Sequence, residues 1–209
     1  MNKYFVKFIR LKPQENPREP ALKKAKLLHA DDLKRIYKRF AHQFIEPFDD
    51  LSDVAIVGMQ TRGVFIARRV QGLIHQSTGT EIPLGVLDIT FYRDDFRTRS
   101  HTPTVQLTDI PFDLSTKHVI LVDDVLYTGR TVRAAMEALM SFGRPKSIVF
   151  TCLIDRGHRE LPVVADYVGM FVPTHTSEEV QVLIEELDGE DAVYVVDRSD
   201  DEKQEENAG

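Results

Sequence analysis

An apolar stretch in the middle of the chain ends in two adjacent carboxylates, Asp123 and Asp124. The residues before them, HVILV at 118–122, have the composition of a buried strand, and a short polar loop, YTGRT at 127–131, follows them. Helical periodicity begins directly after this loop, in GRTVRAAMEALMSFG at 129–143. A plain core strand would have stayed apolar or turned, so this order of parts indicates a site for a polar ligand.

The loop suits a phosphate group. The first turn of a helix has unpaired backbone N–H groups and a positive dipole end, and both attract a phosphate dianion. Gly129 allows the backbone to approach a ligand closely, and the hydroxyls of Thr128 and Thr131 add short donors. Asp123 and Asp124, just before the loop, are placed to accept hydrogen bonds from vicinal hydroxyls. The sequence therefore predicts a sugar-phosphate site.

Two other kinds of site share part of this pattern. An acidic pair after a strand also suits a magnesium-dependent phosphoacceptor site, but that chemistry gives no reason for the TGRT loop. An ordinary capped turn explains the Asp pair alone better than it explains the whole run VILVDDVLYTGRT. The run does not match a Walker P-loop, which requires GxxxxGK[ST].

The elements that position this site follow from periodicity. Helices are expected at 29–48, capped by Asp31 or Asp32, at 63–79, ending at Gly79, and at 129–143, ending at Gly143. Strands are expected at 53–59, 82–92, 118–124, 146–154, 165–172, 180–187 and 191–197. This alternation predicts an α/β fold with a parallel sheet covered on both faces and a ligand crevice beyond the carboxyl ends of its strands.

Length and composition indicate one substantial domain. The chain has 209 residues, of which 42% are hydrophobic. The single cysteine, Cys152, lies in the apolar run SIVFTCLI, so it indicates a buried thiol and a reducing compartment. No signal-peptide pattern and no stretch of about 18 apolar residues is present, so we expect a cytoplasmic protein without a membrane partner.

The two ends differ in composition from the body. Residues 1–26 contain eight Lys or Arg against two Glu, a net charge of +6, and their prolines at 13, 17 and 20 argue against a regular element. Residues 199–209 carry a net charge of −4. We therefore expect a loosely docked basic extension at 1–26, a domain at 27–198 and a disordered acidic tail at 199–209. The long polar segment 93–109 reads as either disordered or a functional lid.

Four segments carry a resemblance to a known family. The run VILVDDVLYTGRTVRAAMEAL at 119–139 resembles the phosphoribosyl pyrophosphate (PRPP) motif of type I phosphoribosyltransferases. Together with TRG at 61–63, DITFYRDD at 88–95 and IDRGHRELPVVADYVG at 154–169, it closely resembles the PyrR family of bifunctional pyrimidine operon attenuators and uracil phosphoribosyltransferases. The likeness extends from about residue 26 to about residue 197.

The resemblance implies the type I phosphoribosyltransferase fold, a central, mostly parallel sheet flanked by helices, with a small hood and a flexible loop. It implies an enzyme that converts uracil and PRPP to UMP and pyrophosphate, and that binds the leader RNA of pyrimidine genes when UMP is high. In this interpretation Asp123 and Asp124 hold the ribose hydroxyls near the C1 that becomes cationic. The 5-phosphate is then wrapped by Val125, Leu126, Tyr127, Thr128, Gly129, Arg130 and Thr131, with Arg130 turned toward solvent or pyrophosphate.

The remaining enzymatic residues also come from the resemblance. Thr61 and Arg62 match the pyrophosphate loop, where Mg²⁺ would be held through PRPP, near Asp123 and Asp124, without a direct protein ligand. Taken alone, Thr61 and Arg62 read as a helix-capping pair. Arg93 belongs to the loop that closes over the site, although residues 96–109 are shorter and differently charged than the usual loop. The uracil hood would contain Asp155, Arg156 and Val180, with Arg156 equally readable as a structural partner.

For RNA, the resemblance indicates two groups of residues: Lys38, Arg39 and His42 on the first helix, and His158 and Arg159 in the later turn. Lys38 replaces a smaller hydroxyl residue of the family. A cationic helix face without this resemblance would usually be only solvated. The family further implies a homodimer or larger homo-oligomer.

Two alternatives to the uracil enzyme remain. One is an RNA-binding attenuator with little catalytic activity, and the other is a phosphoribosyltransferase for another base. The second ranks lower, because DRGHRELP at 155–162 resembles the uracil-specific regulators.

Overall fold

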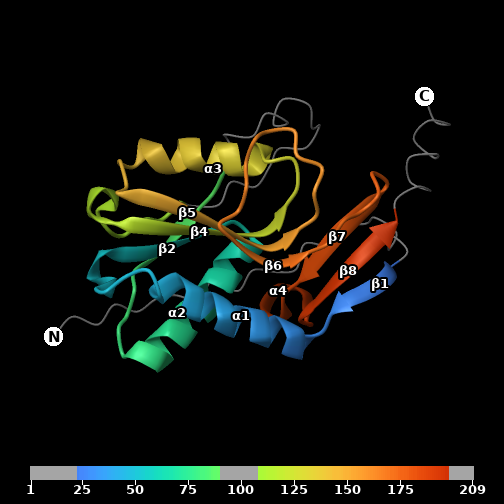
Figure 1. The fold of residues 1–209 in the computed structure, drawn as a ribbon, viewed down its shortest axis with the longest axis horizontal. Coiled ribbons are helices and arrows are strands. Elements are labelled where there is room, and N and C mark those ends of the chain that lie inside the picture. Colours follow the sequence, from blue (N-terminus) through green and yellow to red (C-terminus); the bar gives the residue numbers. More distant parts are fainter. Residues whose placement is uncertain (1–22, 90–107, 198–209) are drawn as a thin grey trace.

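A five-stranded parallel sheet forms the centre of the molecule (Figure 1). The structure is a computed structural model, and it describes residues 23–89 and 108–197. The strand order is β3-β2-β4-β5-β6, and every neighbouring pair is parallel. The strands are β2 (Val54–Met59), β3 (Leu84–Leu87), β4 (His118–Leu126), β5 (Ser147–Asp155) and β6 (Tyr167–Phe171). The predicted α/β fold with a parallel sheet is therefore confirmed.

Helices cover both faces of this sheet. In Figure 1, α1 (Ala30–Ile45) and α2 (Arg62–Thr78) lie on one side and α3 (Arg130–Ser141) on the other. Because side chains alternate along a strand, β4 contributes Ile120 and Val122 to the core under α1 and α2, and Val119 and Leu121 to the core under α3. The two cores fix the height of both helix layers above the sheet.

A second, smaller sheet stands beside the first. It is antiparallel in the order β1-β8-β7, with β1 at Lys23–Leu28, β7 at Glu178–Leu183 and β8 at Ala192–Asp197. The short helix α4 (Glu185–Asp188) connects β7 to β8. This unit is the small hood that the sequence motifs imply. Single 3-10 turns at Leu51–Asp53 and Leu114–Thr116 complete the described elements.

A strand of the hood spans the predicted boundary between the basic extension and the domain. Strand β1 begins at Lys23 and crosses the predicted boundary between residues 26 and 27, so the end of the basic segment belongs to a regular element. Its pairing with β8, which sets Lys26 opposite Tyr194, supplies the backbone hydrogen bonds that its own composition does not indicate. The acidic tail and the rest of the basic extension lie outside the described residues.

Several element ends also differ from the prediction. Helix α1 has His29 at its N-cap rather than Asp31 or Asp32, and Asp32 instead accepts the His29 backbone N–H at 2.9 Å. Strand β3 ends at Leu87 rather than continuing to residue 92. The segment expected as strand 180–187 ends at Leu183, because residues 185–188 turn into α4. Helix α3 ends at Ser141, two residues before Gly143.

Other predicted features hold. Gly79 ends α2 in the left-handed conformation, with φ of 75°. Cys152 is fully buried in β5, and this burial raises the pKa of its thiol. Within residues 23–89 and 108–197, no helix combines the length and the apolar character needed to cross a bilayer.

Candidate active site

The carboxyl ends of three adjacent strands bring the predicted site segments together. Strand β4, which contains Asp123 and Asp124, pairs with β2 on one side and β5 on the other. The Thr61–Arg62 segment follows β2, and Asp155 and Arg156 lie at the end of β5. The sheet therefore places the carboxylate pair between the other two segments. Arg93 lies outside the described residues.

The two carboxylates have different environments. Asp123 is only 6% exposed, and its Oδ1 accepts the backbone N–H of Asp124 at 2.9 Å. Asp124 is half-buried, and its Oδ1 accepts the backbone N–H of Val125 at 2.8 Å. These local bonds use one oxygen of each side chain and fix its direction, so the pair is held rigidly at the end of β4.

The loop between β4 and α3 has the geometry that the phosphate prediction requires. Gly129 occupies the N-cap of α3 with φ of 90°, a conformation that L side chains rarely adopt. A Cβ at this position would also lie 3.3 Å from the side chains of Leu161 and Val163. The hydroxyl of Thr128 accepts the Arg130 N–H at 3.3 Å. The following N–H groups of the first turn cannot bond within the helix and are available to a ligand.

The segment after β5 forms hydrogen bonds to the backbone of this loop. The backbone N–H groups of Glu160 and Leu161 both donate to the Thr128 carbonyl at 3.0 Å. Arg159 donates to the Tyr127 carbonyl at 2.6 Å and also pairs with the Asp155 carboxylate. The loop is thus preorganised by hydrogen bonds that come from a different part of the chain.

Arg130 and Arg156, two of the predicted site residues, make contacts within the protein. Arg130 donates from Nε to Glu160 at 2.6 Å. Arg156 is 6% exposed, lies 4.0 Å above the centre of the Tyr127 ring, and donates to Thr174 Oγ1 at 3.2 Å and to the carbonyl of Glu178. Arg156 therefore connects the loop between β4 and α3 to β7 of the hood.

Val180 lies in β7 and is buried in the hydrophobic core. Its side chain packs inside the protein, so only its backbone could serve a ligand.

The Thr61–Arg62 segment lies close to the carboxylates because the following residue, Gly63, lacks a side chain. A Cβ at Gly63 would stand 2.5 Å from the Val122 carbonyl oxygen and 3.2 Å from Asp123 Cα. The peptide bond between Gln60 and Thr61 is cis. Thr61 occupies the N-cap of α2 but makes no side-chain capping bond, so the helix-capping interpretation of its side chain fails.

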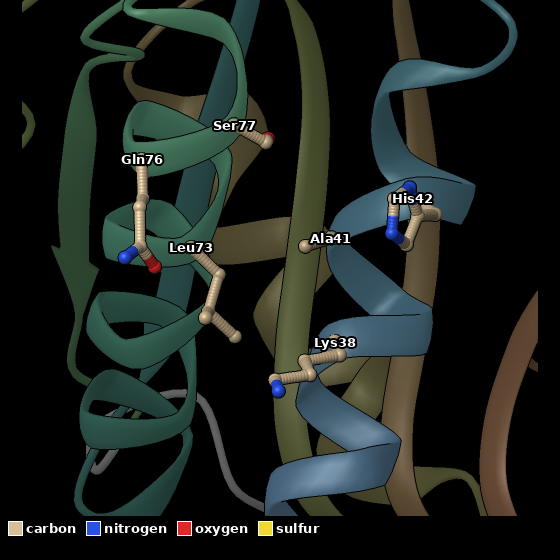
Figure 2. Close-up of a pocket in the computed structure, with 6 residues that line it drawn as sticks. All are labelled: Lys38, Ala41, His42, Leu73, Gln76 and Ser77. Carbon is tan, nitrogen blue, oxygen red and sulfur yellow. The ribbon is translucent and has the colours of Figure 1, made fainter.

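The expected RNA residues fall into two groups with different environments. Lys38 and His42 line an open pocket of about 240 Å³ between α1 and α2, together with Leu73, Gln76 and Ser77 (Figure 2). Arg39 instead donates to the carbonyls of Val168 and Gly169 in β6.

The turn after β5 is also engaged internally. His158 has a positive φ of 58°, and its ring nitrogen lies 2.7 Å from the Thr174 carbonyl. Arg159, as described above, uses its guanidinium on the phosphate loop and on Asp155. Lys38 and His42 thus line the pocket between α1 and α2, whereas Arg39, His158 and Arg159 contact backbone carbonyls.

Comparison with known proteins identifies the family. The phosphoribosyl transferase domain matches residues 25–187. The chain is 49% identical over 180 residues to the bifunctional protein PyrR of Pelotomaculum thermopropionicum, covering 86% of this chain and 99% of the relative. It is 50% identical over 175 residues to the bifunctional protein PyrR of Thermus thermophilus, and this match covers 84% of this chain and 97% of the relative. The chain belongs to the PyrR family.

Family membership confirms the function predicted from the motifs. The chain is a uracil phosphoribosyltransferase, a pentosyltransferase, with a regulatory role in pyrimidine metabolism. The fold agrees, since a hypoxanthine phosphoribosyltransferase of Trypanosoma cruzi, a K68R mutant complexed with IMP, superimposes with a TM-score of 0.66. That likeness covers 92% of this chain and 93% of the other at 17% identity, and so shows the type I fold alone.

Proposed function

We propose that ribose 5-phosphate is transferred from PRPP to uracil at the carboxyl end of β4. The observation that carries this proposal is the position of the Asp123–Asp124 pair between the α3 phosphate loop and the Thr61–Arg62 segment. The backbone N–H groups and hydroxyls of residues 128–131 hold the 5-phosphate, and the two carboxylates hold the ribose hydroxyls. The bond from C1 to pyrophosphate then breaks as the bond from C1 to N1 of uracil forms, and the proton on N1 is released to water or to the departing pyrophosphate.

Charge and burial support these roles. C1 becomes positively charged as pyrophosphate leaves, and a fixed carboxylate nearby stabilises that charge more in a poorly solvated site than in water. Asp123 is buried, and both carboxylates are oriented by backbone N–H groups. The protein therefore meets the developing charge with groups that need no rearrangement.

The residues present also fit Mg²⁺ as a cofactor. This ion is usually held by one or two carboxylates, by water and by phosphate oxygens of the substrate. Asp124 is half-buried at the strand end and offers hard oxygen donors beside the proposed position of PRPP. In the part of the chain that the structure describes, no group of three or more His, Cys, Asp or Glu forms a metal cluster. When bound, Mg²⁺ would neutralise charge on the pyrophosphate, and Arg62 would add one further positive charge.

The catalytic proposal is tested by steady-state release of pyrophosphate from PRPP with Mg²⁺ present. We expect turnover with uracil and none with orotate or hypoxanthine. Loss of the activity in Asp124→Asn would support the site. Turnover with hypoxanthine would favour a phosphoribosyltransferase for another base. No turnover with any base would leave the RNA-binding attenuator with little catalytic activity as the function.

The regulatory role can be made more specific. We propose that UMP in the active site strengthens binding of a leader RNA hairpin to α1, with Lys38 and His42 as phosphate contacts at the pocket between α1 and α2. Arg39, His158 and Arg159 belong to the same proposal as further RNA contacts, because the family resemblance indicates them together with Lys38 and His42. We further propose that the chain assembles as a homodimer or a larger homo-oligomer, which sedimentation of the purified protein measures.

RNA binding is tested by a Lys38→Ala, His42→Ala double variant, with UMP and without it. We expect weaker binding of the leader RNA and a smaller salt dependence, because contacts to phosphate release counterions. Lys34→Ala is the matched control, since Lys34 lies on the same helix but pairs with Asp31 at 3.1 Å. Equal affinity for an unrelated RNA would argue against this proposal.

A further inference from the structure

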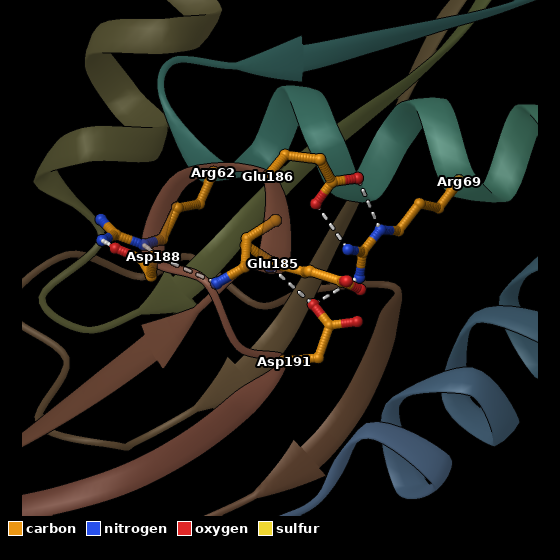
Figure 3. A network of polar contacts seen from close by, with 7 residues as sticks. Arg62, Arg69, Glu185, Glu186, Asp188 and Asp191 are labelled. Atoms are coloured by element: carbon orange, nitrogen blue, oxygen red, sulfur yellow. Dashed lines mark hydrogen bonds and ion pairs between the residues drawn. The ribbon is translucent and has the colours of Figure 1, made fainter. Parts of the chain in front are cut away.

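Two arginines of α2 bind the short helix α4 of the hood (Figure 3). Arg62 and Arg69 are seven residues apart, so they lie on the same face of α2. Arg62 donates to Asp188 from Nη2 at 2.9 Å and from Nε at 3.3 Å. Arg69 donates to Glu186 from Nε at 3.1 Å and to Asp191 from Nη1 at 2.8 Å. The first pair lies at the start of α2, and the second lies two turns further along the helix.

Asp188 is itself fixed in direction. Its Oδ2 accepts the backbone N–H of Ile184 at 2.8 Å, in addition to the bond from Arg62. The side chains of Arg62 and Asp188 are 32% and 20% exposed, so the pair is largely shielded from water. A two-point contact between a guanidinium and a carboxylate sets the plane of the guanidinium as well as its position.

The geometry leaves one edge of the arginine for a ligand. A guanidinium has five N–H donors, and Asp188 takes the Nε and Nη2 edge. Among the contacts between described residues, Nη1 of Arg62 has no acceptor. Arg62 also directly follows Thr61, and Gly63 packs α2 against β4 beside Asp123. Arg62 can therefore hold Asp188 and a second anion at the same time.

We propose that Asp188 is a positioning residue for pyrophosphate binding. It holds one edge of the Arg62 guanidinium so that the other edge is directed at the pyrophosphate of PRPP. This inference rests on the proposed role of Arg62 in the pyrophosphate segment. If Asp188 positions Arg62, removal of the Asp188 charge should weaken pyrophosphate binding. If Asp188 instead competes with pyrophosphate for Arg62, the same change should strengthen it.

The test compares kinetic constants of full-length variants. We measure kcat, the KM for PRPP, the KM for uracil and the inhibition constant of pyrophosphate for Asp188→Asn. Loss of a charge-assisted two-point contact should raise the KM for PRPP and the inhibition constant of pyrophosphate by about tenfold, while kcat and the KM for uracil change by less than about twofold. Asp188→Glu keeps the charge and should restore part of the pyrophosphate affinity.

Glu186→Gln is the matched control, because it weakens the docking of α4 on Arg69 without touching Arg62. We expect Glu186→Gln to leave the KM for PRPP and the inhibition constant of pyrophosphate within about twofold of the wild-type values. An equal loss of pyrophosphate affinity in Glu186→Gln and Asp188→Asn would show that pyrophosphate binding depends on the docking of α4 and not on the direction of Arg62. Tighter pyrophosphate binding in Asp188→Asn would establish competition and overturn the proposal.

Arg62→Ala separates this inference from the proposed function on which it rests. If Arg62→Ala leaves pyrophosphate affinity unchanged, the assignment of Arg62 to the pyrophosphate is wrong. If Arg62→Ala weakens that affinity and Asp188→Asn does not, only the positioning role of Asp188 is wrong.

Discussion

Replacing Gly63 by alanine is expected to damage the active site and the fold together. The new Cβ would lie 2.5 Å from the Val122 carbonyl oxygen, about 0.9 Å inside an ordinary contact distance of roughly 3.4 Å. Its near neighbours are backbone atoms of β4, so no side chain can rotate away to relieve the clash. The start of α2 must move away from Asp123 by nearly that amount. Overpacking of this kind costs about 1 to 3 kcal/mol of stability.

The catalytic effect follows from the same displacement. Thr61 and Arg62 directly precede Gly63, so the pyrophosphate segment would shift relative to the carboxylate pair. A misplacement of about 1 Å can lower a rate on the order of a hundredfold. We expect Gly63→Ala to lower kcat/KM for PRPP by about that factor, and the melting temperature by roughly 3 to 9 °C. A continuous assay of pyrophosphate release and thermal unfolding followed by circular dichroism measure the two effects.

Gly72→Ala provides the control on the same helix. A Cβ at Gly72 would meet nothing within 4 Å, and alanine stabilises a helix interior by up to about 1 kcal/mol relative to glycine. This variant should keep wild-type kinetics with an unchanged or raised melting temperature. Wild-type kinetics and stability in Gly63→Ala would refute the argument that close packing of α2 on β4 sets the position of the pyrophosphate segment.

Three further predictions concern other parts of the molecule. Gly129→Ala should raise the KM for PRPP by about tenfold or more, since φ of 90° strains any residue with a Cβ; an unchanged KM would count against the phosphate loop. Asp124→Asn should lower kcat by at least about a hundredfold with little change in melting temperature, because its carboxylate acts on the reacting sugar and not in the core; undiminished turnover would exclude that role. Burial raises the pKa of Tyr37 from 10.0 to about 12, so the folded state keeps its proton where the unfolded chain loses it. The contribution of Tyr37 to stability should be constant below about pH 10 and fall by about 2 to 3 kcal/mol between pH 10 and 12. In urea unfolding, the wild type should therefore lose about that much more stability than Tyr37→Phe over this range, and an equal loss in both would contradict the assignment.

The features predicted best from the sequence are local ones. The strand, the position of the carboxylate pair at its end and the turn into α3 could be predicted because an apolar run, a Gly at the turn and a helical period follow one another within a few residues. The same holds for α2 and its end at Gly79. Each depends on interactions that close within one or two turns of the chain, and these leave a pattern in the sequence.

Contacts between distant residues could not be predicted in this way. The basic composition of residues 23–28 gave no sign of β1, whose partner β8 lies more than 160 residues further along the chain. The bonds of Arg62 to Asp188 and of Arg39 to the Val168 carbonyl also join residues far apart in sequence, with separations of 126 and 129 residues. The family resemblance assigned Arg39 and Arg159 to RNA contact, and it gave no sign that the fold also brings backbone carbonyl groups within reach of both side chains. No local pattern encodes such a carbonyl.

The central claim is that the amino end of α3 binds a sugar phosphate while Asp123 and Asp124 bind its hydroxyls. A crystal structure of the chain with UMP tests it most directly. We expect the 5-phosphate within about 3 Å of the backbone N–H groups of residues 128–131, with the ribose hydroxyls on the carboxylate pair. A nucleotide bound elsewhere, with this loop empty, would contradict it.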